Sequence, residues 1–162
     1  MRAYITILGR SIWAVINSLY AVMKHEDIHP DIVYIITENI FKEKLESTAE
    51  GVKIVLEEFG IEPRVETKIV AEGKFVLAGN AIKNLIKDLK DQDYTIDVDI
   101  TPGRKSLVAG MMLVLNKEEV DHIFYLDIKT IVDVNYPYEM IPKQIQSLKD
   151  FLKEGKEVHA NE

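Results

Sequence analysis

Two kinds of hydrophobic pattern alternate along the chain. Short runs rich in apolar and β-branched side chains favour strands. Between them lie longer segments in which apolar residues recur every three or four positions, which predicts helices. The strand-like runs are residues 3–8, 31–37, 64–70, 94–100 and 122–128, and the helix-like segments are 12–24, 41–59, 76–89 and 105–116. Such alternation predicts a parallel sheet with right-handed crossovers and helices on both faces.

The last part of the chain has a weaker pattern. Residues 130–134 could return beside the fifth strand as a β-hairpin, and apolar spacing predicts a final helix over 141–153. The polar segment 155–162 is expected to fray. The helix 105–116 is apolar nearly all round, so we expect it to be the most buried helix or one side of a dimer interface. The fold class is therefore α/β: one Rossmann-like domain over residues 1–154, with an open, mainly parallel sheet and room for a C-terminal β-hairpin.

Composition and charge narrow the classes of partner. The 162 residues carry a formal net charge of −7, whereas proteins that coat long DNA or RNA are usually basic, so no long nucleic acid is expected. No segment approaches 18 consecutive apolar residues, so we expect no membrane span. The N-terminal run is too short and too β-branched for a signal peptide, which makes the cytoplasm the expected location. Cysteine is absent, which excludes disulfides and thiolate metal sites.

Two turns carry residues suited to binding phosphate. In an open parallel sheet, ligands bind beyond the carboxyl ends of the strands. If the first and fourth strands are neighbours, the turns 9–11 and 101–106 meet there. Each turn precedes a helix, whose free N–H groups and dipole favour an anion. Gly9 and Gly103 would let the backbone approach a ligand closely. The other side chains supply charge or hydroxyl donors: Arg10, Ser11, Thr101, Arg104, Lys105 and Ser106.

Each of these residues also has a purely structural interpretation. Ser11 could only cap the first helix, as serines often do. Thr101 and Pro102 fit the N-cap and the first position of the next helix. Arg104 and Lys105 could form a solvated first turn. Two cations there oppose the helix dipole by about 0.3–1 kcal/mol each, and a bound anion would explain them.

Other polar and aromatic residues are less specific. Asp97 and Asp99 alternate along the fourth strand, which favours a structural role. Tyr136 and Tyr138 suit surface packing as well as stacking on a base. The segment 128–138 that contains them could reach over the pocket.

Familiar catalytic and metal motifs are missing. A Walker A loop ending at Lys105 would need glycine at the positions of Asp99 and Arg104, and a dinucleotide fingerprint would need glycine at Ser11. There is no Gly-x-Ser-x-Gly elbow. No metal site is expected from the histidines, which have no ligand-like partners in the sequence; they are His25, His29, His122 and His159.

The two turns resemble the motifs of a known family. The run Thr101-Pro102-Gly103-Arg104-Lys105 is similar to the second motif of CARF domains, the CRISPR-associated Rossmann-fold sensors, whose usual form is Thr-Gly-Gly-Thr-Lys. Pro102 replaces one glycine, and Arg104 replaces the residue before the lysine. The turn 8–11 resembles the first motif of the family. The element order agrees over almost the whole chain, and Ser11 together with Arg104 and Lys105 most resembles the standalone ring nucleases.

The resemblance implies a specific activity. Such proteins are homodimers that bind cyclic oligoadenylates, mainly cyclic tetra-adenylate, the second messenger of type III CRISPR complexes. Ring nucleases cleave this ring without a metal or cofactor, giving di-adenylates with a 2′,3′-cyclic phosphate, and so switch the signal off. The attacking group can be the ribose 2′-OH, so the protein needs only to orient the sugar and stabilise charge.

The catalytic residues are then expected to be Lys105 for charge on the scissile phosphate, Arg104 to clamp its oxygens, and Ser11 to bond phosphate or orient the 2′-OH. The remaining ligand-binding residues are Gly9, Arg10, Thr101, Pro102, Gly103 and Ser106. Two other functions stay open: a non-catalytic CARF sensor that acts through a partner, and an unrelated enzyme acting on a nucleotide or sugar phosphate.

Overall fold

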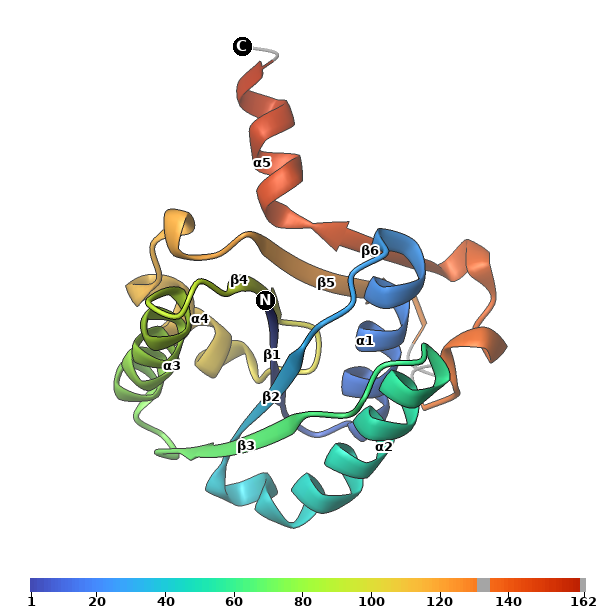
Figure 1. The fold of residues 1–162 in the computed structure, drawn as a ribbon, viewed down its shortest axis with the longest axis horizontal. Helices are drawn as coiled ribbons and strands as arrows, with labels where there is room; N and C mark the ends of the chain where they lie inside the picture. Colours follow the sequence, from blue (N-terminus) through green and yellow to red (C-terminus); the bar gives the residue numbers. More distant parts are fainter. Residues whose placement is uncertain (131–134, 161–162) are drawn as a thin grey trace.

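Residues 1–130 and 135–160, which a computed structural model describes, form a six-stranded sheet with the order β3-β2-β1-β4-β5-β6 (Figure 1). Every pairing among the first five strands is parallel, and β6 is antiparallel to β5. The strands are β1 (Arg2–Leu8), β2 (Ile32–Glu38), β3 (Val65–Val70), β4 (Thr95–Asp99), β5 (His122–Ile128) and β6 (Gln146–Asp150). The predicted Rossmann-like class is confirmed.

Helices cover both faces of this sheet (Figure 1). The helices α1 and α2 pack on one face, and α3 and α4 pack on the other. Their bounds are α1 (Ile12–Glu26), α2 (Leu45–Glu58), α3 (Phe75–Lys90) and α4 (Lys105–Val114), and a 3₁₀ segment (Asn39–Lys44) precedes α2. Further 3₁₀ turns are Lys117–Glu119, Tyr138–Met140 and Lys143–Ile145. In the part of the chain described, no helix has the length and apolar character needed to traverse a bilayer.

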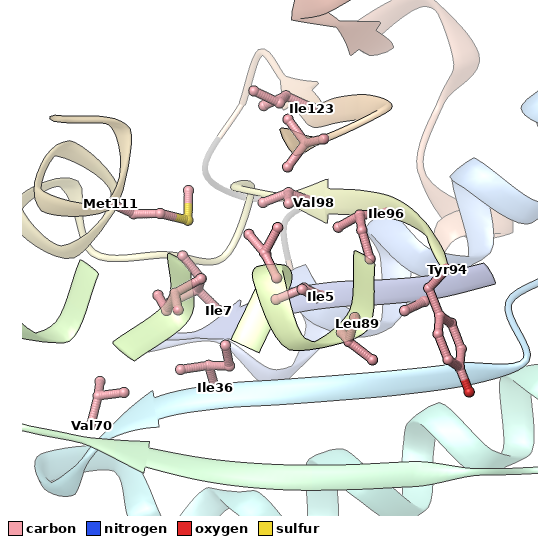
Figure 2. Packing of buried hydrophobic residues seen from close by; sticks show 14 of the residues in the cluster. Ile5, Ile7, Ile36, Val70, Leu89, Tyr94, Ile96, Val98, Met111 and Ile123 are labelled. Atoms are coloured by element: carbon pink, nitrogen blue, oxygen red, sulfur yellow. The ribbon is translucent and has the colours of Figure 1, made fainter. Parts of the chain in front are cut away.

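Alternating side chains of β1 supply both halves of the core, because successive residues of a strand point to opposite faces. Ile5 and Ile7 belong to the cluster under α3 and α4, and Tyr4 and Leu8 belong to the cluster under α1 and α2. Figure 2 shows the first cluster, in which Met111 of α4 points toward the sheet.

The direction of winding changes between β1 and β4. From β1 the chain builds outward through β2 and β3, and it then returns to the other side of β1 to form β4 and β5. At such a switch the loops after the two central strands run to opposite faces and leave a crevice between them. The turns after β1 and β4 are therefore neighbours at the carboxyl edge of the sheet.

The predicted final helix 141–153 is wrong. Its middle part forms the edge strand β6, and the helix α5 (Phe151–Ala160) begins only afterwards. An unpaired edge on β5 would expose its backbone N–H and C=O groups, and β6 covers that edge. A carboxylate oxygen of Asp150 accepts a hydrogen bond from the Leu152 N–H at 3.1 Å, which satisfies a free donor at the start of α5.

The hairpin predicted for residues 130–134 lies almost entirely outside the described residues. The antiparallel partner of β5 is β6, which comes after a longer connection. The segment 155–162, predicted to fray, is helical as far as Ala160, and α5 extends beyond the edge of the sheet (Figure 1).

Helix α4 is not the most buried helix. Only Leu107, Gly110 and Met111 are buried, whereas Met112 and Leu113 are 42% and 78% exposed. The apolar character that predicted burial is therefore divided between a face in the core and a face turned to solvent.

Candidate functional site

A cleft of about 660 Å³ opens between the turns that follow β1 and β4. The two turns form one wall of the cleft. The carboxyl end of β5 forms the other, through Tyr125, Leu126 and Ile128. The cleft also brings together every site residue predicted from the sequence except Gly9: Arg10, Ser11, Thr101, Pro102, Gly103, Arg104, Lys105 and Ser106. The strand order thus joins two segments about ninety residues apart in the sequence.

The two turns touch through their backbones. A Cβ atom added at Gly9 would lie 2.3 Å from the carbonyl oxygen of Pro102, closer than any side chain allows. Gly9 was expected to admit a ligand, but its close neighbour is the other turn. Glycine at this position lets the turns after β1 and β4 come together and form one wall of the cleft.

Ser11 caps α1, as its structural interpretation predicts. Its hydroxyl oxygen accepts a hydrogen bond from the Ala14 N–H at 3.2 Å. This bond uses a lone pair of the oxygen, so the O–H group is still a donor at the edge of the cleft. Capping and anion binding are therefore compatible in one side chain.

The N-cap role predicted for Thr101, and with it the first helical position for Pro102, is wrong. An extra turn separates these residues from α4, which begins at Lys105 with Arg104 as an N-cap residue that makes no side-chain capping bond. The Thr101 hydroxyl oxygen instead accepts from the Leu126 N–H at 2.8 Å and ties the turn to β5. Because Arg104 does not cap α4 with its side chain, the first N–H groups of the helix are available to an anion.

The buried carboxyl group of Asp99 links β1, α1 and the turn after β4 through hydrogen bonds. One carboxylate oxygen accepts from the hydroxyls of Thr6 at 2.9 Å and Ser18 at 2.5 Å, and the other accepts from the Thr101 N–H at 2.9 Å. The pKa of Asp99 is raised above its ordinary value, because the effect of burial outweighs the lowering effect of these donors. The structural role predicted for Asp99 is confirmed, since its carboxyl group links β1, α1 and the turn after β4.

Positive charge dominates the cleft. Arg10, Arg104 and Lys105 line it, and none of the described lining residues is a carboxylate. The Arg104 Nη1 donates to the Glu38 Oε2 at 3.0 Å. Lys105 is exposed, and within residues 1–130 and 135–160 it has no ion-pair or hydrogen-bond partner. A cation without a partner beside a helix N-terminus is poised to bind an anion.

Sequence reasoning missed two polar contributors to this edge of the sheet. Glu38 ends an otherwise apolar strand, and that abrupt change was the signal for a charge at the carboxyl edge. The Lys44 Nζ donates to the backbone carbonyl of Arg10 at 2.5 Å, so it braces the first turn and adds a cation beside it. Nothing in the local pattern marked Lys44.

Tyr136 and Tyr138 do not line the cleft. The Tyr138 hydroxyl and the Nε2 of His25 share a hydrogen bond at 2.8 Å, and the Tyr138 ring lies 5.5 Å from that of Tyr20. The packing interpretation of Tyr138 is therefore confirmed. Tyr136 is 46% exposed, and its carbonyl accepts from the Asn17 Nδ2 at 2.8 Å. Among the described residues, no group of three His, Asp or Glu side chains could hold a metal ion.

No family model and no curated protein matches the chain, but solved structures do. Csm6 from Enterococcus italicus, bound to cyclic hexa-2′-fluoro-hexa-dAMP, matches 99% of this chain with a TM-score of 0.61 at 14% identity. Can2 from Sulfobacillus thermosulfidooxidans, in complex with cyclic tetra-adenylate, matches 78% with a TM-score of 0.57 at 12% identity. A type III CRISPR defence DNA nuclease activated by cyclic oligoadenylate matches 78% with a TM-score of 0.54 at 13% identity.

The matched region is only part of each of these proteins. It makes up 44% of the Csm6 chain, 32% of the Can2 chain and 19% of the DNA nuclease chain. At identities this low, the structural matches establish a common fold alone. The chain therefore has the fold of the CARF domains of type III CRISPR proteins, and the resemblance carried by its two turns is confirmed at that level.

Proposed function

We propose that this protein is a ring nuclease of the cytoplasm that binds cyclic tetra-adenylate in the cleft and cleaves it without a metal ion. The observation that carries the proposal is the convergence of the turns 9–11 and 101–106 on one cleft that Arg10, Arg104 and Lys105 line. Two helix N-termini and three cations suit phosphodiesters. The apolar wall from β5 suits the faces of nucleobases. Can2, which shares the fold, was solved with cyclic tetra-adenylate.

The reaction needs no group from outside the ligand and the protein. The ribose 2′-OH attacks the adjacent phosphorus, a P–O2′ bond forms, and the P–O5′ bond breaks. The proton lost by the 2′-OH is balanced by the one gained at the 5′ oxygen, so the products are a 2′,3′-cyclic phosphate and a free 5′-OH. The protein contributes by holding the 2′ oxygen in line and by stabilising charge on the phosphoryl oxygens.

Three side chains take the roles expected from the sequence. The Lys105 ammonium stabilises the scissile phosphate and the leaving 5′ oxygen. Arg104 contacts phosphate oxygens with the N–H groups that Glu38 does not use. The Ser11 O–H donates to phosphate or orients the 2′-OH. None of the described residues that line the cleft is a general base of tuned pKa, so turnover should be slow, since such a base typically contributes about 10²–10⁴-fold.

The proposal includes a homodimer. Met112 and Leu113 expose apolar surface on α4, the helix whose N-terminus faces the cleft. Burial of this face against a second copy would remove that surface from water. A two-fold axis beside the two clefts would also present them to opposite phosphates of a four-membered ring.

One observation favours the alternative of a non-catalytic sensor. Ser11 already caps α1 and Arg104 is already paired with Glu38, so two of the three proposed catalytic residues have structural partners. A cleft of this kind could bind the ring tightly and pass the signal to a partner without cleavage.

Incubation with labelled cyclic tetra-adenylate tests the proposal. We expect linear products with a 2′,3′-cyclic phosphate in excess EDTA. Lys105→Ala and Ser11→Ala should each reduce the rate constant for cleavage at least about tenfold, a barrier increase of about 1.4 kcal/mol. The exposed Lys87 on α3 does not line the cleft, so Lys87→Ala removes the same charge elsewhere and serves as the control.

The outcomes separate the candidate functions. Tight binding without cleavage would establish the sensor, and absence of binding would leave the unrelated phosphate enzyme. Cleavage that EDTA abolishes would refute the metal-free reaction. Cleavage at the unaltered rate in both variants would refute the assigned site.

A further inference from the structure

Glu38 is the most conspicuous group near the cleft that the proposed reaction does not use. It is the last residue of β2, and its side chain is only 1% exposed. An ionised carboxylate that is buried this deeply is costly unless it is paired and hydrogen-bonded. Its Oε2 lies 3.0 Å from the Arg104 Nη1, and its Oε1 accepts a long hydrogen bond from the Gly73 N–H at 3.4 Å.

This ion pair bridges strands that are not neighbours. Glu38 ends β2, Arg104 follows β4, and β1 lies between those strands in the sheet (Figure 1). The carboxylate therefore reaches across the end of β1 to the second anion-binding turn. The pair joins residues 66 positions apart in the sequence and fixes one side of the cleft.

The geometry of the pair leaves Arg104 able to bind a ligand. A guanidinium carries five N–H donors in a rigid, planar fork, and the hydrogen bond to Glu38 uses one of them. The Arg104 side chain is 37% exposed and lines the cleft. Holding the guanidinium by one end reduces the rotamer freedom that it would lose on binding phosphate. Lys105, which follows it, has no such support in the part of the chain that the structure describes.

We propose that Glu38 is a positioning residue of the cleft, whose buried carboxylate aims the Arg104 guanidinium at a bound phosphate. This inference rests on the proposed function only in that the cleft must bind phosphate groups. It predicts a change in phosphate affinity opposite in sign to the change that simple electrostatics predicts. Removal of a negative charge next to a cationic cleft should strengthen anion binding by Coulomb's law. If Glu38 acts by positioning Arg104, its neutralisation should weaken binding instead.

The test compares Glu38→Gln with the exposed Glu43→Gln in the full chain. Glu43 lies five residues further along, so its variant makes the same change of charge near the same edge of the sheet. Calorimetric titrations use two probes, cyclic tetra-adenylate and inorganic pyrophosphate. We expect Glu38→Gln to weaken binding of both by roughly tenfold, the scale of a hydrogen bond to a charged group. Glu43→Gln should leave affinity unchanged or slightly higher.

A second pair of variants separates positioning from a general loss of structure. If Glu38 acts through Arg104, the double variant Glu38→Gln with Arg104→Ala should bind no more weakly than Arg104→Ala alone. Glu38→Asp keeps the charge but shortens the side chain, so it should recover part of the affinity. If circular dichroism shows that Glu38→Gln does not fold, the affinity of Glu38→Asp is compared with that of the unaltered protein instead.

The two probes distinguish failure of the inference from failure of the proposed function. Pyrophosphate binding that depends on Glu38, with no binding of cyclic tetra-adenylate, would support the positioning role and reject the ring nuclease. Unchanged or tighter binding of both probes by Glu38→Gln would overturn the inference, as would equal losses in Glu38→Gln and Glu43→Gln. Additive losses in the double variant would also overturn it. If neither probe binds the unaltered protein, both proposals fall.

Discussion

Replacement of Asp97 by asparagine measures the effect of a buried charge in the centre of the sheet. The Asp97 side chain is wholly buried, and among the described residues neither carboxylate oxygen has a hydrogen-bond partner. Its ion pair with Arg2 is long, with 3.5 Å between the Arg2 Nε and a carboxylate oxygen. Burial raises the pKa of Asp97 from 3.8 to about 6, against the smaller lowering effects of Arg2 and His122.

The direction of the pH effect follows from this shift. Between pH 3.8 and about 6, the unfolded chain has lost a proton that the folded chain keeps. The free energy of unfolding therefore falls as the pH rises through that window. The rise from 3.8 to about 6 corresponds to a loss of about 3 kcal/mol, because one pKa unit is worth about 1.36 kcal/mol. Asparagine has nearly the same shape but cannot ionise, so the variant escapes this loss.

Urea unfolding followed by circular dichroism at about pH 4 and about pH 7.5 tests this reasoning. The free energy of unfolding of Asp97→Asn, minus that of the unaltered protein, should increase by about 2.4 kcal/mol between the two pH values, because at pH 4 the unfolded carboxyl is already more than half ionised. The exposed Asp88→Asn makes the same change of formal charge and serves as the control. A difference that stays constant with pH, or that moves in favour of the unaltered protein as the pH rises, would show that the buried carboxyl does not resist ionisation.

Four further substitutions, one of them a control, probe the packing, the cap and the proposed dimer. Gly110→Ala should lower the free energy of unfolding by about 1–3 kcal/mol in urea titrations, because its Cβ would lie 2.4 Å from the carbonyl oxygen of Phe75. Gly155→Ala, which meets open space, should cause no loss. Ser11→Asp keeps an oxygen that can cap α1 but brings a negative charge to the cleft, so calorimetry should show no anion binding while the melting temperature is nearly retained. Leu113→Glu, at a position 78% exposed, should yield a folded monomer in sedimentation velocity, and a persisting dimer would exclude this face as the interface.

Much of the fold could be predicted because its signals are local. The apolar, β-branched run 122–128 coincides with β5, and the predicted strand 3–8 and helix 12–24 differ from β1 and α1 by no more than two residues at either end. Gly60 shortly after α2 has a φ of +72°, the left-handed backbone with which a glycine commonly ends a helix. The failures lie where tertiary contacts override local spacing. Apolar residues recur at helical intervals at Ile141, Ile145, Leu148 and Leu152, but the open edge of β5 makes the middle of that segment the strand β6.

In the site, too, features with local signals were predicted and features that depend on tertiary contacts were not. Gly9 and the turns around Ser11 and Lys105 were found from the sequence, because glycine, hydroxyl and cationic residues after a strand have a local meaning. The partner that holds Arg104 was not found, because Glu38 lies 66 residues away and only the strand order brings the two together. The N-cap assignment of Thr101 failed for a related reason. Its hydroxyl had a competing donor, the N–H of Leu126 on β5, that no local pattern reveals.

The acidic character of the whole chain and the basic character of the cleft have one structural explanation. The protein carries a net charge of −7, yet the carboxylates of Glu38 and Asp99, which contact the turn after β4, are buried and satisfied by donors from neighbouring elements. Buried carboxylates can hold cationic and polar groups in place without standing between the cleft and its ligand. The local field at the cleft mouth is then set by Arg10 and Lys105 together with two helix N-termini. Neutralisation of exposed acids should therefore change solubility more than ligand affinity, whereas neutralisation of either buried acid should disturb the cleft itself.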